Sequence, residues 1–151
     1  MKRSGISLKS MLMSAVLVIA LALFAAFFGG CSADCRIEGH SWKFTLLQNN
    51  SGTVIKCSQS ESSLYPDAVA AQISVATDGG VLTITEDGAA TEYEYSVYER
   101  SAGGTIYTLV RDGQSCGLAS VGITSYADGT GEYTLIVTVD GNSCYFIAPV
   151  E

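Results

Sequence analysis

The sequence predicts an all-β protein: an antiparallel up-and-down meander of about eight or nine strands that curls into a small barrel. Apolar and polar residues alternate along nine segments rich in β-branched and aromatic side chains. Five Asp-Gly pairs stand between such segments, and this pair favours tight hairpins because glycine accepts a positive φ. An open sheet of this length would leave edges prone to aggregation, which favours closure into a barrel. A two-sheet β-sandwich is the alternative fold.

The first 30 residues differ in composition from the rest of the chain. Lys2, Arg3 and Lys9 are their only charged side chains, and an apolar run follows over Met11–Phe28. A basic start, an apolar stretch and small residues before a boundary are typical of a signal peptide, whose apolar part is expected to be a helix. The run is nearly long enough to cross a bilayer, so a retained anchor helix is the alternative.

Gly29-Gly30-Cys31 follows this run and resembles the lipobox of bacterial lipoproteins. The resemblance implies that residues 1–30 are removed as a signal peptide and that Cys31 is lipidated, with palmitate-type acyl chains. Two acyl chains give the stable anchoring that one chain does not. We therefore expect a lipidated cysteine with a short tether over residues 31–39 and a β-barrel domain over residues 40–151. The expected location is extracytoplasmic, on a membrane of the cell envelope.

The charge of the chain argues against nucleic acid as a partner. Residues 31–151 carry five basic and fifteen acidic side chains, spread along the chain. A surface with this excess of negative charge repels phosphate backbones.

Four cysteines remain after Cys31: Cys35, Cys57, Cys116 and Cys144. An even number outside the cytoplasm favours disulfides, with three connectivities open, whereas one disulfide or free buried thiols are the alternatives. The four cysteines include no closely spaced pair of the kind that binds a metal ion. Simple alternation of strand direction would place all four at the end where the tether enters. Cys116 and Cys144 would then lie two strands apart, too far for a bond, so we expect Cys35 to pair with a strand cysteine.

Nine strands are expected, and the segment between the second and third is expected to be a loop with a short helix over residues 58–71. In the first strand, alternation places Trp42, Phe44 and Leu46 on one face. The expected strands span residues 41–48, 53–58, 70–77, 81–86, 91–99, 105–111, 116–124, 132–139 and 143–148.

The opening of the first strand, Gly39-His40-Ser41-Trp42, is similar to the opening of a lipocalin barrel. More closely, the chain resembles small bacterial lipoproteins with a lipocalin-like barrel. The motifs that carry this resemblance are Trp42-Lys43-Phe44, Val54 to Cys57, Asp78 to Thr85, Tyr93 to Tyr95 and Tyr126 to Gly129. The resemblance implies a barrel whose interior could serve as a ligand pocket.

Aromatic side chains are the candidate binding residues. A cavity for a small apolar ligand could be lined by Trp42, Phe44, Tyr93, Tyr95, Tyr107 and Tyr133. The alternative is a packed core with the tyrosine hydroxyl groups at its rim.

No catalytic set is visible in the sequence. His40 is the only histidine, no nucleophile motif accompanies it, and the acidic turns lack the spacing of a calcium loop. We therefore expect no enzyme activity, no metal and no cofactor. The expected function is that of a membrane-tethered binding or interaction module for a small apolar ligand or an extracellular protein. A structural or protective envelope protein with a packed core is the alternative.

Overall fold

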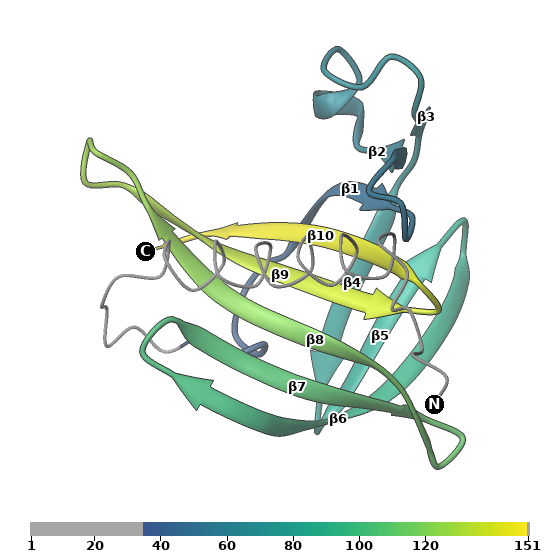
Figure 1. Ribbon diagram of the computed structural model, residues 1–151, viewed down its shortest axis with the longest axis vertical. Helices are drawn as coiled ribbons and strands as arrows, with labels where there is room; N and C mark the ends of the chain where they lie inside the picture. The colour runs from purple at the N-terminus through teal and green to yellow at the C-terminus, as the bar shows by residue number, and fades with distance from the viewer. Residues whose placement is uncertain (1–34, 151) are drawn as a thin grey trace, which may run out of the picture.

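The structure is a computed structural model that describes residues 35–150; the expected signal peptide, its helix and Cys31 lie outside the described residues. The all-β class is confirmed. Ten strands form one strongly curled sheet, a half-barrel, so the two-sheet sandwich is not the fold (Figure 1). Residues 40–48, which open the expected barrel domain, run into its first strand.

The expected strand segments are present with small shifts at their ends, and a two-residue strand is added to them. The strands are β1 (Lys43–Gln48), β2 (Val54–Cys57), β3 (Val69–Ala70), β4 (Ile73–Asp78), β5 (Val81–Glu86), β6 (Ala89–Ser101), β7 (Gly104–Arg111), β8 (Gln114–Ser125), β9 (Gly131–Val139) and β10 (Asn142–Pro149). Their order across the sheet is β3-β2-β1-β10-β9-β8-β7-β6-β5-β4. Strands β4 to β10 form a continuous antiparallel meander, and β10 then pairs with β1.

Three of the Asp-Gly pairs form the tight turns that the sequence predicts. In Asp87-Gly88, Asp112-Gly113 and Asp140-Gly141, both residues have positive φ, between 49° and 80°. This is the backbone of a type I′ turn, whose twist matches that of the two strands it joins. These pairs therefore fix the β5–β6, β7–β8 and β9–β10 hairpins.

The segment between β2 and β4 departs from simple alternation. It contains the short helix expected there, a 3₁₀ turn η1 (Gln59–Glu61), and returns through β3. Because β3 pairs with β2 in parallel and leads directly into β4, strand β4 runs in the same direction as β2. All strands after β2 consequently have the opposite direction to the one that simple alternation assigns.

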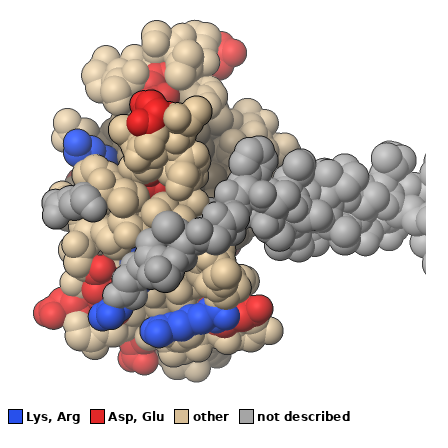
Figure 2. Space-filling view, turned by 90° about the vertical axis from the view of Figure 1, so that its left-hand side faces the viewer, with Lys and Arg blue, Asp and Glu red and all other residues tan. Residues whose placement is uncertain are grey.

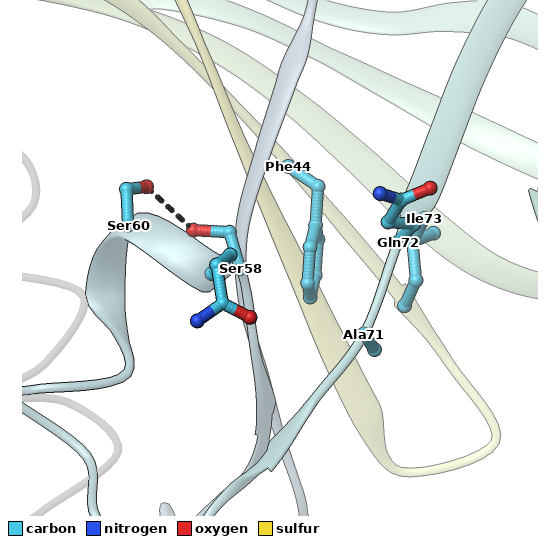
Figure 3. Close-up of a pocket in the computed structure, with 7 residues that line it drawn as sticks. Phe44, Ser58, Ser60, Ala71, Gln72 and Ile73 are labelled. Carbon is cyan, nitrogen blue, oxygen red and sulfur yellow. Dashed lines mark hydrogen bonds between the residues drawn. The ribbon is translucent and has the colours of Figure 1, made fainter.

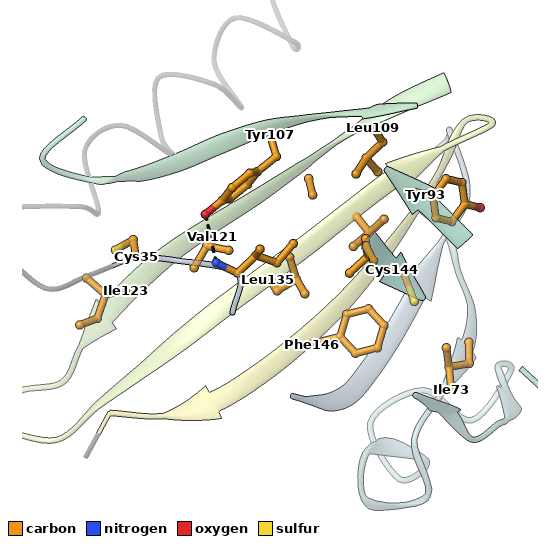
Figure 4. Packing of buried hydrophobic residues seen from close by; sticks show 14 residues of the cluster. Cys35, Ile73, Tyr93, Tyr107, Leu109, Val121, Ile123, Leu135, Cys144 and Phe146 are labelled. Atoms are coloured by element: carbon orange, nitrogen blue, oxygen red, sulfur yellow. Dashed lines mark hydrogen bonds between the residues drawn. The ribbon is translucent and has the colours of Figure 1, made fainter. Parts of the chain in front are cut away.

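The expected arrangement of the cysteines is therefore wrong. Cys116 and Cys144 lie near the starts of β8 and β10, whereas Cys35 lies beside Ile123, near the end of β8 (Figure 4). No two of the four described cysteines are joined by a disulfide, so the expected bond between Cys35 and a strand cysteine is not formed.

The core lies on the concave face of the sheet. Tyr107, Leu109, Val121, Leu135 and Phe146 are at most 2 % exposed and belong to one cluster. A β-bulge between Phe44 and Leu46 changes which residues of β1 face this core. Phe44 and Leu47 pack against it, whereas Leu46 lies opposite Tyr145 on the other face. The expectation that Leu46 shares a face with Phe44 is wrong for this reason.

The two edges of the sheet, β3 and β4, approach each other because the chain joins them through residues 71–72. The Ala71 N–H donates to the Cys57 carbonyl at 2.8 Å. The Lys56 ammonium group forms an ion pair with the Glu86 carboxylate, which links β2 to β5 across the opening. These contacts hold the curl of the sheet.

Candidate functional site

The structure brings the six candidate binding residues together on the concave face. Tyr93 and Tyr107 are buried there. The other four pack against the same core and are partly buried: Trp42, Phe44, Tyr95 and Tyr133. They come from strands far apart in the sequence, and the curl of the sheet directs them inward.

The chain itself occupies the space between these side chains. Residues 35–38, called here the tether segment, run along the concave face, and Ile37 has no exposed surface. The Ile37 N–H donates to the Tyr107 hydroxyl oxygen at 3.1 Å, and Trp42 Nε1 donates to the Ile37 carbonyl at 2.9 Å. Two of the residues proposed to hold a ligand therefore hold the backbone of Ile37.

The Tyr95 and Tyr107 hydroxyl groups have raised pKa values and remain protonated at neutral pH. Burial raises the pKa of Tyr107. Burial also raises the pKa of Tyr95, as does its hydrogen bond to the Glu38 carboxylate at 2.5 Å. The Tyr95 and Tyr107 rings meet edge to face, with centroids 5.5 Å apart. Raised pKa values of this kind make these hydroxyl groups hydrogen-bonding groups and not general bases.

His40 is a packing residue at the rim of the concave face. Its ring lies 4.2 Å from the Tyr133 ring centroid and 5.1 Å from that of Trp42. Both neighbours are aromatic, and the contacts are those of ring stacking and edge-to-face packing. His40 thus helps to order the residues that precede β1.

An open groove lies at the edge of the core, between β1 and the connection from β3 to β4 (Figure 3). It measures about 310 Å³, and its apolar wall is formed by Phe44, Ala71 and Ile73. Ser58, Gln59, Ser60 and Gln72 supply its neutral polar wall. Sequence reasoning missed this groove because it is made by the parallel β2–β3 step. Only the Ser- and Gln-rich composition of residues 58–63 pointed to an irregular segment there.

The Cys144 thiol group is buried and is affected by both charges of the Lys56–Glu86 ion pair. Burial raises the pKa of Cys144 to about 12, and the Glu86 carboxylate acts in the same direction. A thiol with this pKa carries almost no thiolate at neutral pH and is a poor nucleophile.

Two searches of the described residues gave no site. Among residues 35–150, no three His, Cys, Asp or Glu side chains are grouped so that they could hold a metal ion. Within the same range, no helix has the length and apolar character needed to span a bilayer.

Comparison with known proteins found no matching family model, no similar curated protein and no similar solved structure.

Proposed function

We propose that this protein is a lipid-anchored protein of the cell envelope and acts as a non-enzymatic interaction module whose partner binds outside the half-barrel. The observation that carries this proposal is the position of Ile37. A fully buried side chain of the chain itself lies where an internal ligand would lie. The binding residues available to a partner are then those that face the surface of the molecule, including the groove at the edge of the core.

The lipid anchor is supported by the sequence of residues 1–31 and by the start of the described fold. Cys35 is already buried in the core, four positions after Cys31. Cleavage before Cys31 would leave the whole sheet, which begins at Lys43, on the anchored product. The three residues between the two cysteines would form the link between lipid and fold.

The groove beside β1 is the proposed contact site for a protein partner. Strand β4 is at the end of the sheet order, so one of its edges pairs with no strand of the sheet. A free strand edge next to an apolar wall suits an extended peptide, which adds backbone hydrogen bonds to a strand and places alternate side chains in pockets. Phe44 and Ile73 would receive apolar side chains, and Gln72 would supply an amide.

We also propose that the half-barrel is a lipocalin-like barrel whose interior is used for its own chain. The uninterrupted antiparallel meander from β4 to β10, and its return to β1, support this proposal. In a barrel of this size the interior can either be filled by side chains or hold one small ligand. The buried Ile37 favours the filled interior.

The test is site-specific photo-crosslinking in intact cells that produce the full, lipid-anchored chain. A photoreactive residue at Gln72, in the groove, is expected to give one discrete protein adduct, which Phe44→Ala weakens. The matched control is Gln114, an exposed glutamine at the start of β8. The same adducts from both positions would contradict the groove as the contact site.

Two further measurements separate the parts of the proposal. Cys31→Ser is expected to abolish acylation and to release the protein from the membrane fraction. Native mass spectrometry of the unmodified chain is expected to show no small molecule that is lost on denaturation. Such an adduct would instead place a ligand in the interior. If no position on the groove captures a protein, the filled core favours the structural or protective function.

A further inference from the structure

We infer that one end of the half-barrel rests on the lipid bilayer, with the side chains of Tyr98 and Tyr126 in its interfacial region. This inference rests on the proposed lipid anchor at Cys31. The end in question, called here the tether end, consists of Cys35 and Arg36, residues 97–104 and the loop at residues 126–130.

Strand pairing places these segments together. Gly104, which follows the turn, lies opposite Gly122 of β8, and β8 ends at Ser125 immediately before the loop. Cys35 lies beside Ile123 of the same strand (Figure 4). Val97 lies opposite Tyr107, whose hydroxyl group holds the tether segment. The chain therefore enters the core at this end.

The covalent link to the lipid is short. Four residue steps separate Cys31 from Cys35, and a fully extended chain spans at most about 3.6 Å per residue, or about 14 Å in all. Cys35 is 7 % exposed and fixed in the core, so this point of the tether end can lie no further than about 14 Å from an acylated Cys31. The headgroup region on each side of a bilayer is itself about 5–8 Å deep. Little distance remains between the tether end and the lipid.

The exposed side chains of this end suit a membrane interface. Tyr98 is 70 % exposed, and Tyr126 and Val97 are each 46 % exposed. Tyrosine is favoured at membrane interfaces because its ring is apolar and its hydroxyl group is polar. The Tyr126 hydroxyl donates to the Glu132 carboxylate at 2.8 Å, which leaves its ring as the contact surface.

Charge at the tether end is mixed, which indicates the kind of lipid. Arg36 and Arg100 are exposed, but so are Glu99 and Asp128. Figure 2 looks at the molecule from this side, and much of the visible surface is uncharged, with basic and acidic side chains among it. A surface that carries both positive and negative charges has little net attraction to anionic lipid, so we expect contact with zwitterionic headgroups.

The test uses the full, acylated protein in phosphatidylcholine vesicles with a nitroxide label at one position at a time. Tyr98→Cys and Tyr126→Cys carry the label at the tether end, in a Cys116→Ser background that removes the partly exposed native thiol. Val69→Cys is the matched control because Val69 is 64 % exposed and lies away from the tether end, on β3, which strand pairing places beside the start of β10. Asp112→Cys marks the turn between β7 and β8 at the other end. The measured quantity is collision of the label with an aqueous nickel chelate.

We expect labels at 98 and 126 to lose at least threefold in nickel accessibility on going from the unanchored Cys31→Ser form to the vesicle-bound form. Labels at 69 and 112 should not change. Equal accessibility at all four positions, in protein that floats with the vesicles, would overturn the inference and leave the anchor intact. Protein that lacks the acyl mass and does not float would overturn the anchor and the inference together.

Discussion

Ile37 and its neighbours are the part of the molecule where single atoms decide between a ligand cavity and a packed core. The side chain has no exposed surface, and its removal would leave a hole that the surrounding β-sheet can fill only in part. Ile37→Ala is expected to lower the free energy of unfolding by about 2–5 kcal/mol, measured by urea denaturation. Leu64→Ala is the control: Leu64 is 69 % exposed, and we expect a change within about 0.5 kcal/mol. Equal, small losses would contradict the assignment of Ile37 to the core.

The hydroxyl group of Tyr107 has a separate role from its ring. Tyr107→Phe keeps the ring but leaves the buried Ile37 N–H without its acceptor. We expect a loss of about 1–3 kcal/mol in the free energy of unfolding because an unsatisfied buried donor costs its full desolvation. Tyr95→Phe is the matched change, since the Tyr95 hydroxyl group donates to Glu38 in an exposed bond. A larger loss for Tyr95→Phe than for Tyr107→Phe would show that the tether segment is not held as described.

The cysteines also differ from one another at this scale. Cys57 and Cys144 are buried, burial raises the Cys144 pKa to about 12, and Cys116 is partly exposed. In the folded protein at pH 8, iodoacetamide should therefore modify Cys116 well before Cys57 or Cys144, as read by peptide mass spectrometry. The same reaction in 8 M urea, where all thiols are exposed, is the control. Modification of Cys144 at the rate of Cys116 would contradict its burial.

At the scale of elements, β8 depends on a residue without a side chain. A Cβ atom added at Gly117 would lie 2.2 Å from the Thr138 carbonyl oxygen of β9 and 2.9 Å from the Val139 side chain. The carbonyl oxygen belongs to the backbone and cannot rotate away from the added methyl group as a side chain could. Gly117→Ala should therefore disturb the β8–β9 pairing and lower the free energy of unfolding by about 2 kcal/mol or more. Gly113→Ala is the comparison: φ is +74° and no atom lies within 4 Å, so only backbone strain of about 1–2 kcal/mol is expected. Unfolding curves of the two variants that coincide would contradict the close approach.

The elements could be predicted where local chemistry determines them. Asp87-Gly88, Asp112-Gly113 and Asp140-Gly141 fix their hairpins through the positive φ of both residues, so the strands on either side follow from the turns. The two-residue strand β3 carries no such signal, because two residues cannot show a period. Its parallel pairing with β2 depends on long-range closure of the sheet. Because this pairing reverses the direction of every later strand, Cys116 and Cys144 lie at the opposite end of the sheet from the one that the sequence predicted. The bulge in β1 likewise depends on pairing with β10 and was not visible in the alternation of β1.

At the scale of the whole molecule, the side chains that line the concave face could be predicted from the sequence, whereas Ile37, which fills that face, could not. Tyr93 and Tyr95 were expected to line the interior, and they are two residues apart in β6, so both face the core. Ile37 belongs to a segment of the chain with no strand pattern, so its position inside the curl could not be predicted from period or propensity. The groove beside Phe44 was hidden for the same reason, since it exists only where the two sheet edges meet. The residue types therefore indicated which side chains line the concave face, and only the folded sheet showed that Ile37 lies among them.

The pH dependence of stability follows from the burial of ionisable side chains by the curled sheet. Burial is the main cause that raises the pKa of Tyr93, Tyr95, Tyr107, Tyr145 and Cys144. A group whose pKa is higher in the folded than in the unfolded state stabilises the fold below the unfolded pKa, and that contribution is lost as pH rises towards the folded value. The unfolded values are 9.0 for cysteine and 10.0 for tyrosine. The free energy of unfolding, from urea titrations, should therefore be level from pH 7 to about 8.5 and should fall at higher pH.

Tyr145→Phe isolates one of these contributions. Burial alone raises the pKa of Tyr145, so removing its hydroxyl group takes away one group that resists ionisation in the folded state. The variant should lose stability less steeply than the parent chain above pH 10, because fewer protons are released on unfolding there. Tyr98→Phe is the matched control, since Tyr98 is 70 % exposed and the change removes a hydroxyl group that the fold does not bury. Stability that rises above pH 9, or equal alkaline slopes for Tyr145→Phe and the parent chain, would contradict burial of these tyrosines by the curled sheet.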